Sequence, residues 1–274
     1  MNSLRLTAIL LLFCITAWGQ ADSFPLLGTR GRDLADFAVD NLGYMYLLGR
    51  GGELKKLNAN GDSVSVFNDV RKYGRLYSID VSNPLKVILF YRDFGTIVVL
   101  DRMLNNRNTI DMRKQQILQA RAVAQSFDNG IWVYDELDGR LKRLDDNGTV
   151  TNETVDFRVV FDEPPAPAHI ADADRLVYLY DPQKGLFVLD YFGNLRNKVA
   201  LLGWTDVQVL GNRVIGRKGE TLESYVPGTL KLEEQSLPIL LTGVTKVLVS
   251  IDRLYCLKDG KVFIYGINRK ENNE

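Results

Sequence analysis

The sequence contains few cysteines, a single histidine and no excess of either charge. Of its 274 residues, two are cysteine and one is histidine, and 34 basic residues balance 34 acidic ones. A neutral chain has no global electrostatic attraction to nucleic acid or to an anionic membrane surface, so we expect no nucleic-acid partner. With one histidine, His169, and no Gly-x-Ser-x-Gly motif, the chain also lacks the usual constituents of a nucleophilic hydrolase.

Long apolar runs are scarce as well, and the one that stands out is at the N-terminus. It follows Arg5 and leads to Ala17 and Gly19, which have the spacing of a signal-peptidase site. This pattern predicts a secretory signal peptide over residues 1–19, because the run is too short for a membrane span. We therefore expect residues 20–274 to form a single exported domain in the periplasm, with no transmembrane segment.

Removal of that signal would also remove Cys14 and leave Cys256 as the only thiol. One cysteine cannot form an intramolecular disulfide, and Cys256 lies between apolar neighbours, so we expect it to pack as a small hydrophobic residue. Lipid attachment at Cys14 is disfavoured because the bulky Phe13 precedes it, where a lipoprotein signal has a small residue.

The rest of the sequence is a repeat. Each unit has an apolar strand, a polar turn that contains a glycine, and a second strand. The turn glycines are Gly52, Gly95, Gly139, Gly185, Gly219 and Gly260, and they are separated by 43, 44, 46, 34 and 41 residues. Glycine supplies the positive φ that tight hairpin turns require. A spacing of about 40 residues is the period of four-stranded propeller blades.

Further strands are expected on both sides of these hairpins. Strands that precede them are predicted at 36–40, 76–80, 121–128, 169–174, 206–210 and 245–252, and strands that follow at 63–67, 108–112 and 154–160. The stretch 111–127 has fair helix propensity, but we interpret it as strand, turn and strand, with one helical turn as the alternative. The sequence thus predicts an all-β, six-bladed β-propeller with four-stranded antiparallel blades.

The two ends of the chain are expected to close this ring. The sixth unit lacks an outer fourth strand, whereas residues 22–28 precede the first blade and belong to no unit. Pairing of 22–28 with 261–267 would complete the last blade and cover both strand edges.

Two units carry a resemblance to a known family. Both 134–145 and 180–190 begin with Tyr-Asp, have a glycine after three intervening residues and end with Leu-Asp. They resemble blades of bacterial six-bladed propellers of the NHL and TolB-like superfamily, and the likeness extends over the whole mature chain at the level of blades. It implies the fold, but not an activity, because propellers include enzymes, adaptors and sugar-binding proteins.

Three aspartates are candidate metal ligands, since gluconolactonase-like propellers hold a divalent metal near the axis. Asp172, Asp174 and Asp206 lie on or near predicted inner strands. Their spacing is not diagnostic, and aspartates at strand ends commonly cap turns, so we predict neither a metal site nor a cofactor.

The candidate binding site lies on the loops that cross from one blade to the next. These are 71–76, 115–121, 163–169, 201–206 and the apolar 237–243, and they gather Tyr73, Arg75, Arg121, His169 and Trp204. Irregular loops on a regular scaffold tend to carry recognition, and aromatic and arginine side chains anchor protein interfaces. For Trp204, packing between blades is an equally open interpretation.

The functional prediction is a monomeric, non-catalytic binding or scaffold propeller of the bacterial cell envelope. Its expected partners are envelope proteins, with an outer-membrane complex as one candidate and a position peripheral to the outer membrane. Two alternatives stay open: a metal-dependent lactonase-like or lyase-like enzyme, and a glycan-binding propeller in which Trp204 and tyrosines stack on sugars.

Overall fold

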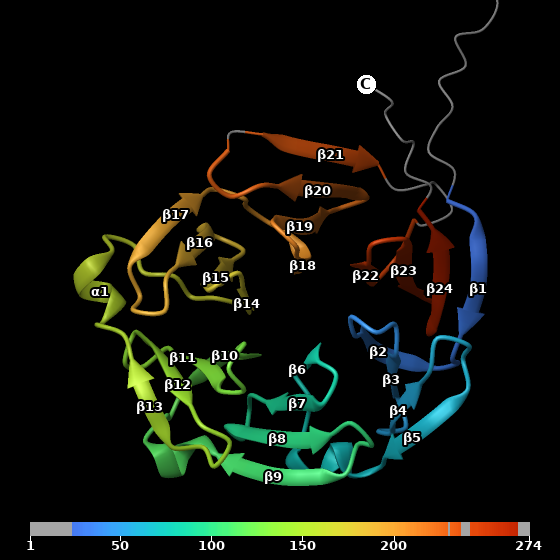
Figure 1. The fold of residues 1–274 in the computed structure, drawn as a ribbon, viewed down its shortest axis with the longest axis horizontal. Coiled ribbons are helices and arrows are strands. Elements are labelled where there is room, and N and C mark those ends of the chain that lie inside the picture. Colours follow the sequence, from blue (N-terminus) through green and yellow to red (C-terminus); the bar gives the residue numbers. More distant parts are fainter. Residues whose placement is uncertain (1–23, 230, 237–241, 268–274) are drawn as a thin grey trace, which may run out of the picture.

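The computed structural model describes residues 24–229, 231–236 and 242–267, which form six four-stranded antiparallel sheets around a central axis (Figure 1). The predicted six-bladed propeller is therefore confirmed. The sheets follow one another around the ring in chain order. In the first five sheets the strand that comes first in the chain lies innermost, and in the sixth the innermost strand is the first of its three C-terminal strands.

The strands are as follows, from the axis outward. Blade one has β2 (Leu34–Val39), β3 (Met45–Gly49), β4 (Leu54–Leu57) and β5 (Ser63–Phe67), and blade two has β6 (Ser78–Asn83), β7 (Lys86–Tyr91), β8 (Thr96–Asp101) and β9 (Asn106–Asp111). Blade three has β10 (Ala120–Gln125), β11 (Ile131–Asp135), β12 (Arg140–Leu144) and β13 (Val150–Glu153), and blade four has β14 (His169–Ala173), β15 (Leu176–Asp181), β16 (Gly185–Leu189) and β17 (Leu195–Val199). Blade five has β18 (Thr205–Leu210), β19 (Arg213–Lys218), β20 (Thr221–Tyr225) and β21 (Leu232–Ser236), and blade six has β22 (Lys246–Val249), β23 (Arg253–Lys258), β24 (Lys261–Gly266) and β1 (Leu26–Arg30).

The hydrophobic core consists of six clusters, each of which lies between two neighbouring blades. The middle strands of blade two are buried on both faces: every residue of β7 is buried, and so is every residue of β8 except Asp101. Cys256 is buried in the cluster between blades five and six, as expected for a small hydrophobic residue. Burial raises the pKa of its thiol to about 12.

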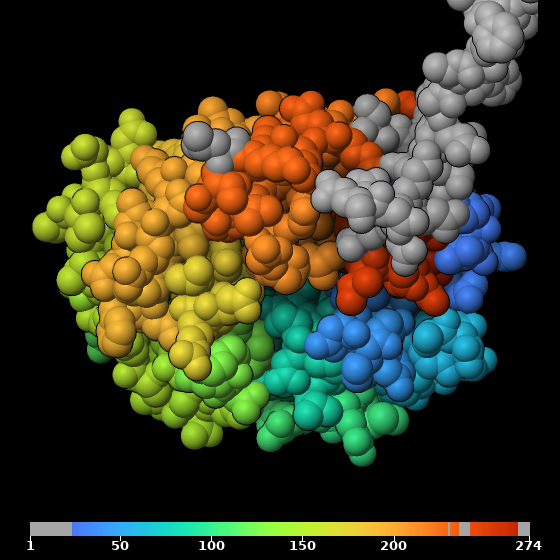
Figure 2. All heavy atoms as spheres, turned by 45° about the horizontal axis from the view of Figure 1, so that its top comes forward, coloured from blue at the N-terminus to red at the C-terminus, as the bar shows by residue number. Residues whose placement is uncertain are grey.

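The two chain ends close the ring. Strand β1 pairs antiparallel with β24, with Leu26 opposite Tyr265 and Arg30 opposite Val262. Figures 1 and 2 show this contact as a blue segment beside a red one. The predicted closure is confirmed, although the strand covers 26–30 rather than 22–28. Residues 22 and 23 lie outside the described part of the chain.

The outer strand of blade three differs from the sequence expectation. Residues 154–160 were expected to be that strand, but it is β13, and the chain then forms one helical turn, α1 (Phe157–Val160). Asp156 caps this turn by accepting a hydrogen bond from the backbone N–H of Arg158 at 2.9 Å. Phe157 is fully buried between blades three and four, which anchors the turn.

The crossings from blade one to two and from blade two to three contain short helical turns as well. A 3₁₀ turn, η2 (Met112–Gln115), interrupts the stretch 111–127, whose predicted order of strand, turn and strand is otherwise confirmed. Another, η1 (Asp69–Tyr73), lies between β5 and β6 and was not predicted.

Candidate functional site

The six inner strands surround a central cavity of about 670 Å³. We call the side on which the inner strands begin and the chain crosses between blades the crossing face. The opposite side, with the turns that leave the inner strands, is the turn face. Because all six inner strands start on the crossing face, side chains at their first residues meet around one mouth of the cavity.

Polar side chains on the inner strands hold neighbouring blades together. Between blades five and six, Asp206 accepts a hydrogen bond from Val247 N at 3.0 Å and pairs with Arg217 at 2.6 Å. Gln208 accepts a hydrogen bond from Val249 N at 3.0 Å. These side chains therefore act as bridges between inner strands that do not share a sheet ladder.

Asp172 forms a similar bridge between blades three and four. Its carboxylate accepts hydrogen bonds from Trp132 Nε1 at 2.8 Å, from Tyr191 Oη at 2.7 Å and from Ser126 Oγ at 3.1 Å. Both oxygens of Asp172 and one oxygen of Asp206 accept hydrogen bonds from the protein, so these carboxylates serve structural contacts. Over the described ranges, no group of three or more histidine, cysteine, aspartate or glutamate side chains is placed to hold a metal ion.

His169 is the first residue of β14 and its side chain is exposed within the cavity mouth. The surrounding blades enclose it, and this desolvation lowers the pKa of the imidazole; Asp80 opposes the shift and Lys246 adds to it. The ring is therefore neutral at pH 7. It forms no side-chain hydrogen bond with any residue that the structure describes.

The other predicted site residues are dispersed over the crossing face. Tyr73 ends η1 and packs against Tyr91 with ring centroids 5.4 Å apart, and Arg75 is exposed two residues later. Arg121, on β10, is half-buried and pairs with Glu136. Of the five predicted residues, His169 and Trp204 line the central cavity, Arg75 lines a separate cleft, and Tyr73 and Arg121 line neither.

Trp204 packs between blades, which was the alternative interpretation of this residue. It is 2% exposed, and its indole N–H donates to Glu223 Oε2 at 2.6 Å. Its backbone N–H donates to Tyr180 Oη at 2.5 Å. The indole lies directly over Gly216, where an added Cβ would be 2.1 Å from the ring.

A cleft of about 600 Å³ lies on the crossing face between blades one and two. Sequence reasoning included Arg75 in the site but missed three further lining residues, Arg50, Arg71 and Tyr77. Arg71 lies in the crossing loop 71–76, which the sequence identified. Because arginine is a residue type that anchors protein interfaces, Arg71 could have been found by the same criterion as Arg75. The apolar segment 237–243 was also expected on this face, but residues 237–241 lie outside the described part of the chain.

Tyr77 and Asp36 line both the cleft and the central cavity. The two hollows therefore adjoin at the point where β2 and β6 begin. Tyr77 is 40% exposed, and its ring is fixed by an edge contact with Phe90 at 5.6 Å and by the Arg92 guanidinium at 5.2 Å. Together the cleft and the cavity mouth form a recessed surface with arginine and aromatic side chains, the types that anchor protein interfaces.

Comparison with known proteins supports the fold. No protein-family model matches the chain, and no curated protein matches it. Among solved structures, virginiamycin B lyase from Staphylococcus aureus has 10% identity and a TM-score of 0.61, covering 90% of this chain and 100% of that one. The Neurospora crassa Pan2 WD40 domain has 12% identity and a TM-score of 0.61, with 91% and 97% coverage.

BamB from Moraxella catarrhalis shares 14% identity over 84% of this chain and 71% of its own, but its TM-score of 0.45 is too low to support an argument. At such identities the similarity concerns the fold alone. The expected blade-level resemblance to six-bladed propellers is confirmed on that basis.

Proposed function

We propose that this chain is a non-catalytic binding and scaffold propeller of the bacterial cell envelope, which holds a protein partner on its crossing face. The observation that carries the proposal is the recessed surface where the cleft and the cavity mouth meet at Tyr77. A rigid ring presents irregular loops in fixed positions, which lowers the entropic cost of binding a partner.

The envelope location rests on the N-terminal sequence, because residues 1–19 have the pattern of a signal peptide. These residues lie outside the described part of the chain. Within the described part, the helices are too short to cross a membrane. Mass spectrometry of the protein from the producing cell should find Gln20 at the N-terminus and one free thiol. A retained apolar run, or a lipid on Cys14, would refute export as a free periplasmic protein.

Affinity capture from envelope extracts tests the binding function. We expect the wild-type protein to recover a partner that a Tyr73→Ala, Arg75→Ala variant recovers poorly. The matched control carries Leu85→Ala and Phe127→Ala, two exposed side chains on turns of the turn face. Equal recovery by the folded crossing-face variant would contradict the assignment of this face, and absence of any partner would contradict the function.

A lyase-like or lactonase-like activity is the second candidate, and one observation favours it. His169 presents a neutral, unpaired imidazole inside a cavity of about 670 Å³, where a general base could contact a small substrate. Stoichiometric Ca²⁺, Mg²⁺ or Zn²⁺ that resists dialysis would favour the enzyme over the scaffold. Glycan binding has less support, because the Trp204 ring expected to stack on a sugar is buried.

A further inference from the structure

We propose that the cleft between blades one and two binds an acidic, extended segment of the partner protein. This inference rests on the proposed protein-binding function and names the chemistry that the partner presents. It is carried by the charge of the cleft lining, by the fixed position of one arginine, and by the aromatic side chain at the inner end of the cleft.

The ionisable side chains that line the cleft are three arginines and one carboxylate. The carboxylate, Asp36, is already engaged by Lys246, with Nζ 2.7 Å from Oδ1. Arg50 pairs with Asp33 at 3.4 Å, where both side chains are largely exposed and the attraction is weak. Arg71 and Arg75 have no carboxylate partner in the described ranges, so the cleft retains positive charge.

Arg71 is held in position for binding. Its Nη2 donates a hydrogen bond to the backbone carbonyl of Arg50, which ties the guanidinium to the turn between β3 and β4. The side chain passes over Gly52, where an added Cβ would be 2.7 Å from Arg71 Nε, and the φ of +93° at Gly52 also favours glycine. The remaining guanidinium donors can bind a carboxylate with little further loss of side-chain entropy.

Arg75 and Tyr77 extend the surface toward the cavity mouth. Arg75 is exposed and forms no hydrogen bond or ion pair with any described residue. Residues 75 and 77 lie two positions apart on the segment that leads into β6, and both line the cleft. A peptide with acidic residues over the arginines and an apolar residue against Tyr77 would match both features.

Fluorescence anisotropy with a fluorescein-labelled octaglutamate peptide tests the inference, with octaglutamine as the uncharged reference. We expect the mature protein to bind octaglutamate and not octaglutamine. An Arg71→Gln, Arg75→Gln variant should bind octaglutamate about tenfold or more weakly, because each charge-assisted hydrogen bond is lost. Raising NaCl from about 50 to about 500 mM should weaken binding to the wild type by screening.

The matched control is Arg175→Gln, which removes an exposed arginine from the turn between β14 and β15 on the turn face. It should bind octaglutamate as the wild type does. Equal binding by the cleft variant and the wild type, with matching thermal unfolding of both, would overturn the inference. Preference for a heparin-derived hexasaccharide over octaglutamate would also overturn it, since the cleft would then take an anionic glycan.

The inference and the proposed function can fail separately. If a partner is captured through Tyr73 and Arg75 but octaglutamate does not bind, the scaffold function stands and the inference of an acidic segment is refuted. If octaglutamate binds in the cleft but no partner is captured, the proposed scaffold function is contradicted and the cleft is an anion-binding site of another kind.

Discussion

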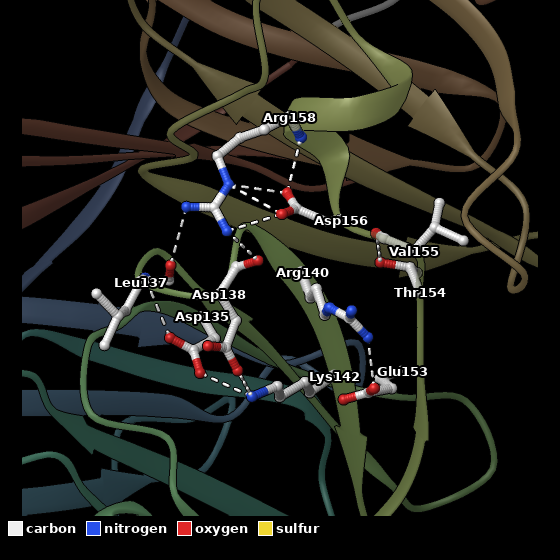
Figure 3. A network of polar contacts seen from close by, with 10 residues as sticks. All are labelled: Asp135, Leu137, Asp138, Arg140, Lys142, Glu153, Thr154, Val155, Asp156 and Arg158. Atoms are coloured by element: carbon white, nitrogen blue, oxygen red, sulfur yellow. Dashed lines mark hydrogen bonds and ion pairs between the residues drawn. The ribbon is translucent and has the colours of Figure 1, made fainter.

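Replacement of Lys142 by methionine should destabilise blade three strongly. The Lys142 side chain is 6% exposed on β12 and its Nζ lies 2.8 Å from Oδ2 of Asp135, a carboxylate that is 1% exposed (Figure 3). Asp138, in the adjacent turn, forms a second ion pair with the same ammonium group. Methionine fills a similar volume without the charge, so the buried Asp135 carboxyl group would lose the ammonium group that pairs with it.

Removal of one partner from a buried ion pair costs about 3–5 kcal/mol of unfolding free energy. In a chain of this size, that loss lowers the melting temperature by an amount on the order of 10 °C. The double variant Asp135→Asn, Lys142→Met should recover to within about 1 kcal/mol of the wild type, because no buried charge is left unpaired. The asparagine also keeps an acceptor for Leu137 N, which lies 3.2 Å from Asp135 Oδ1.

Urea and thermal unfolding of the purified protein, followed by tryptophan fluorescence, measure these differences. Lys55→Met is the matched control, because Lys55 lies on the third strand of blade one but is exposed, and its removal should change stability by about 0.5 kcal/mol or less. The reasoning is refuted if Lys142→Met loses less than about 1 kcal/mol, or if the double variant is as unstable as the single one.

Three further predictions concern other parts of the ring. Deletion of residues 20–30 removes β1 and exposes the edge of β24. This should lower the melting temperature by several degrees and promote aggregation. An unchanged melting curve would mean that β1 contributes nothing to closure of the ring. Gly216→Ala should lower the free energy of unfolding by about 1–3 kcal/mol, because the new Cβ must displace the Trp204 indole. Urea unfolding followed by tryptophan fluorescence should show a lower midpoint and an altered emission maximum of the folded protein. The hydrogen bond from Lys142 lowers the pKa of the Asp138 carboxyl group, so ionised Asp138 stabilises the fold above the ordinary carboxyl pKa of about 4, and this contribution is lost as the pH falls through the lowered pKa. The difference in unfolding free energy between the wild type and Asp138→Asn should therefore shrink below about pH 4. A difference that stays constant with pH would contradict the assignment.

The fold was predictable because its signals are local. The glycine at each hairpin turn has a positive φ in the structure, and at Gly185 an added Cβ would be 2.2 Å from the Val199 carbonyl oxygen. Such constraints appear in the sequence as residue type and spacing. The helical turn α1 escaped prediction because its cause is tertiary: residues 154–160 alternate acceptably for a strand, but Phe157 is buried against the next blade.

The site was less predictable for the same reason. Sequence identified Arg75 and Trp204 as interface-forming residue types. It could not show that Trp204 has buried partners, whereas Arg75 has none among the residues that the structure describes. Nor could it show that Tyr77 and Asp36 line the same hollows, because they belong to different blades that come together only when the ring forms. Residue type indicates what a side chain can bind, and only packing shows whether that capacity is already used.

This distinction also determines which part of the described surface can bind a partner through charge. The inner-strand carboxylates Asp172 and Asp206 are engaged in contacts between blades, so they stabilise the ring and cannot readily serve a ligand. Among the described residues, Arg75 and His169 form no side-chain hydrogen bond or ion pair, and Arg71 has no carboxylate partner. All three lie on the crossing face, in the cleft or at the cavity mouth. Side chains that bond across the inner strands make the ring rigid, whereas the arginines of the cleft keep donors that a bound segment of the proposed kind could use.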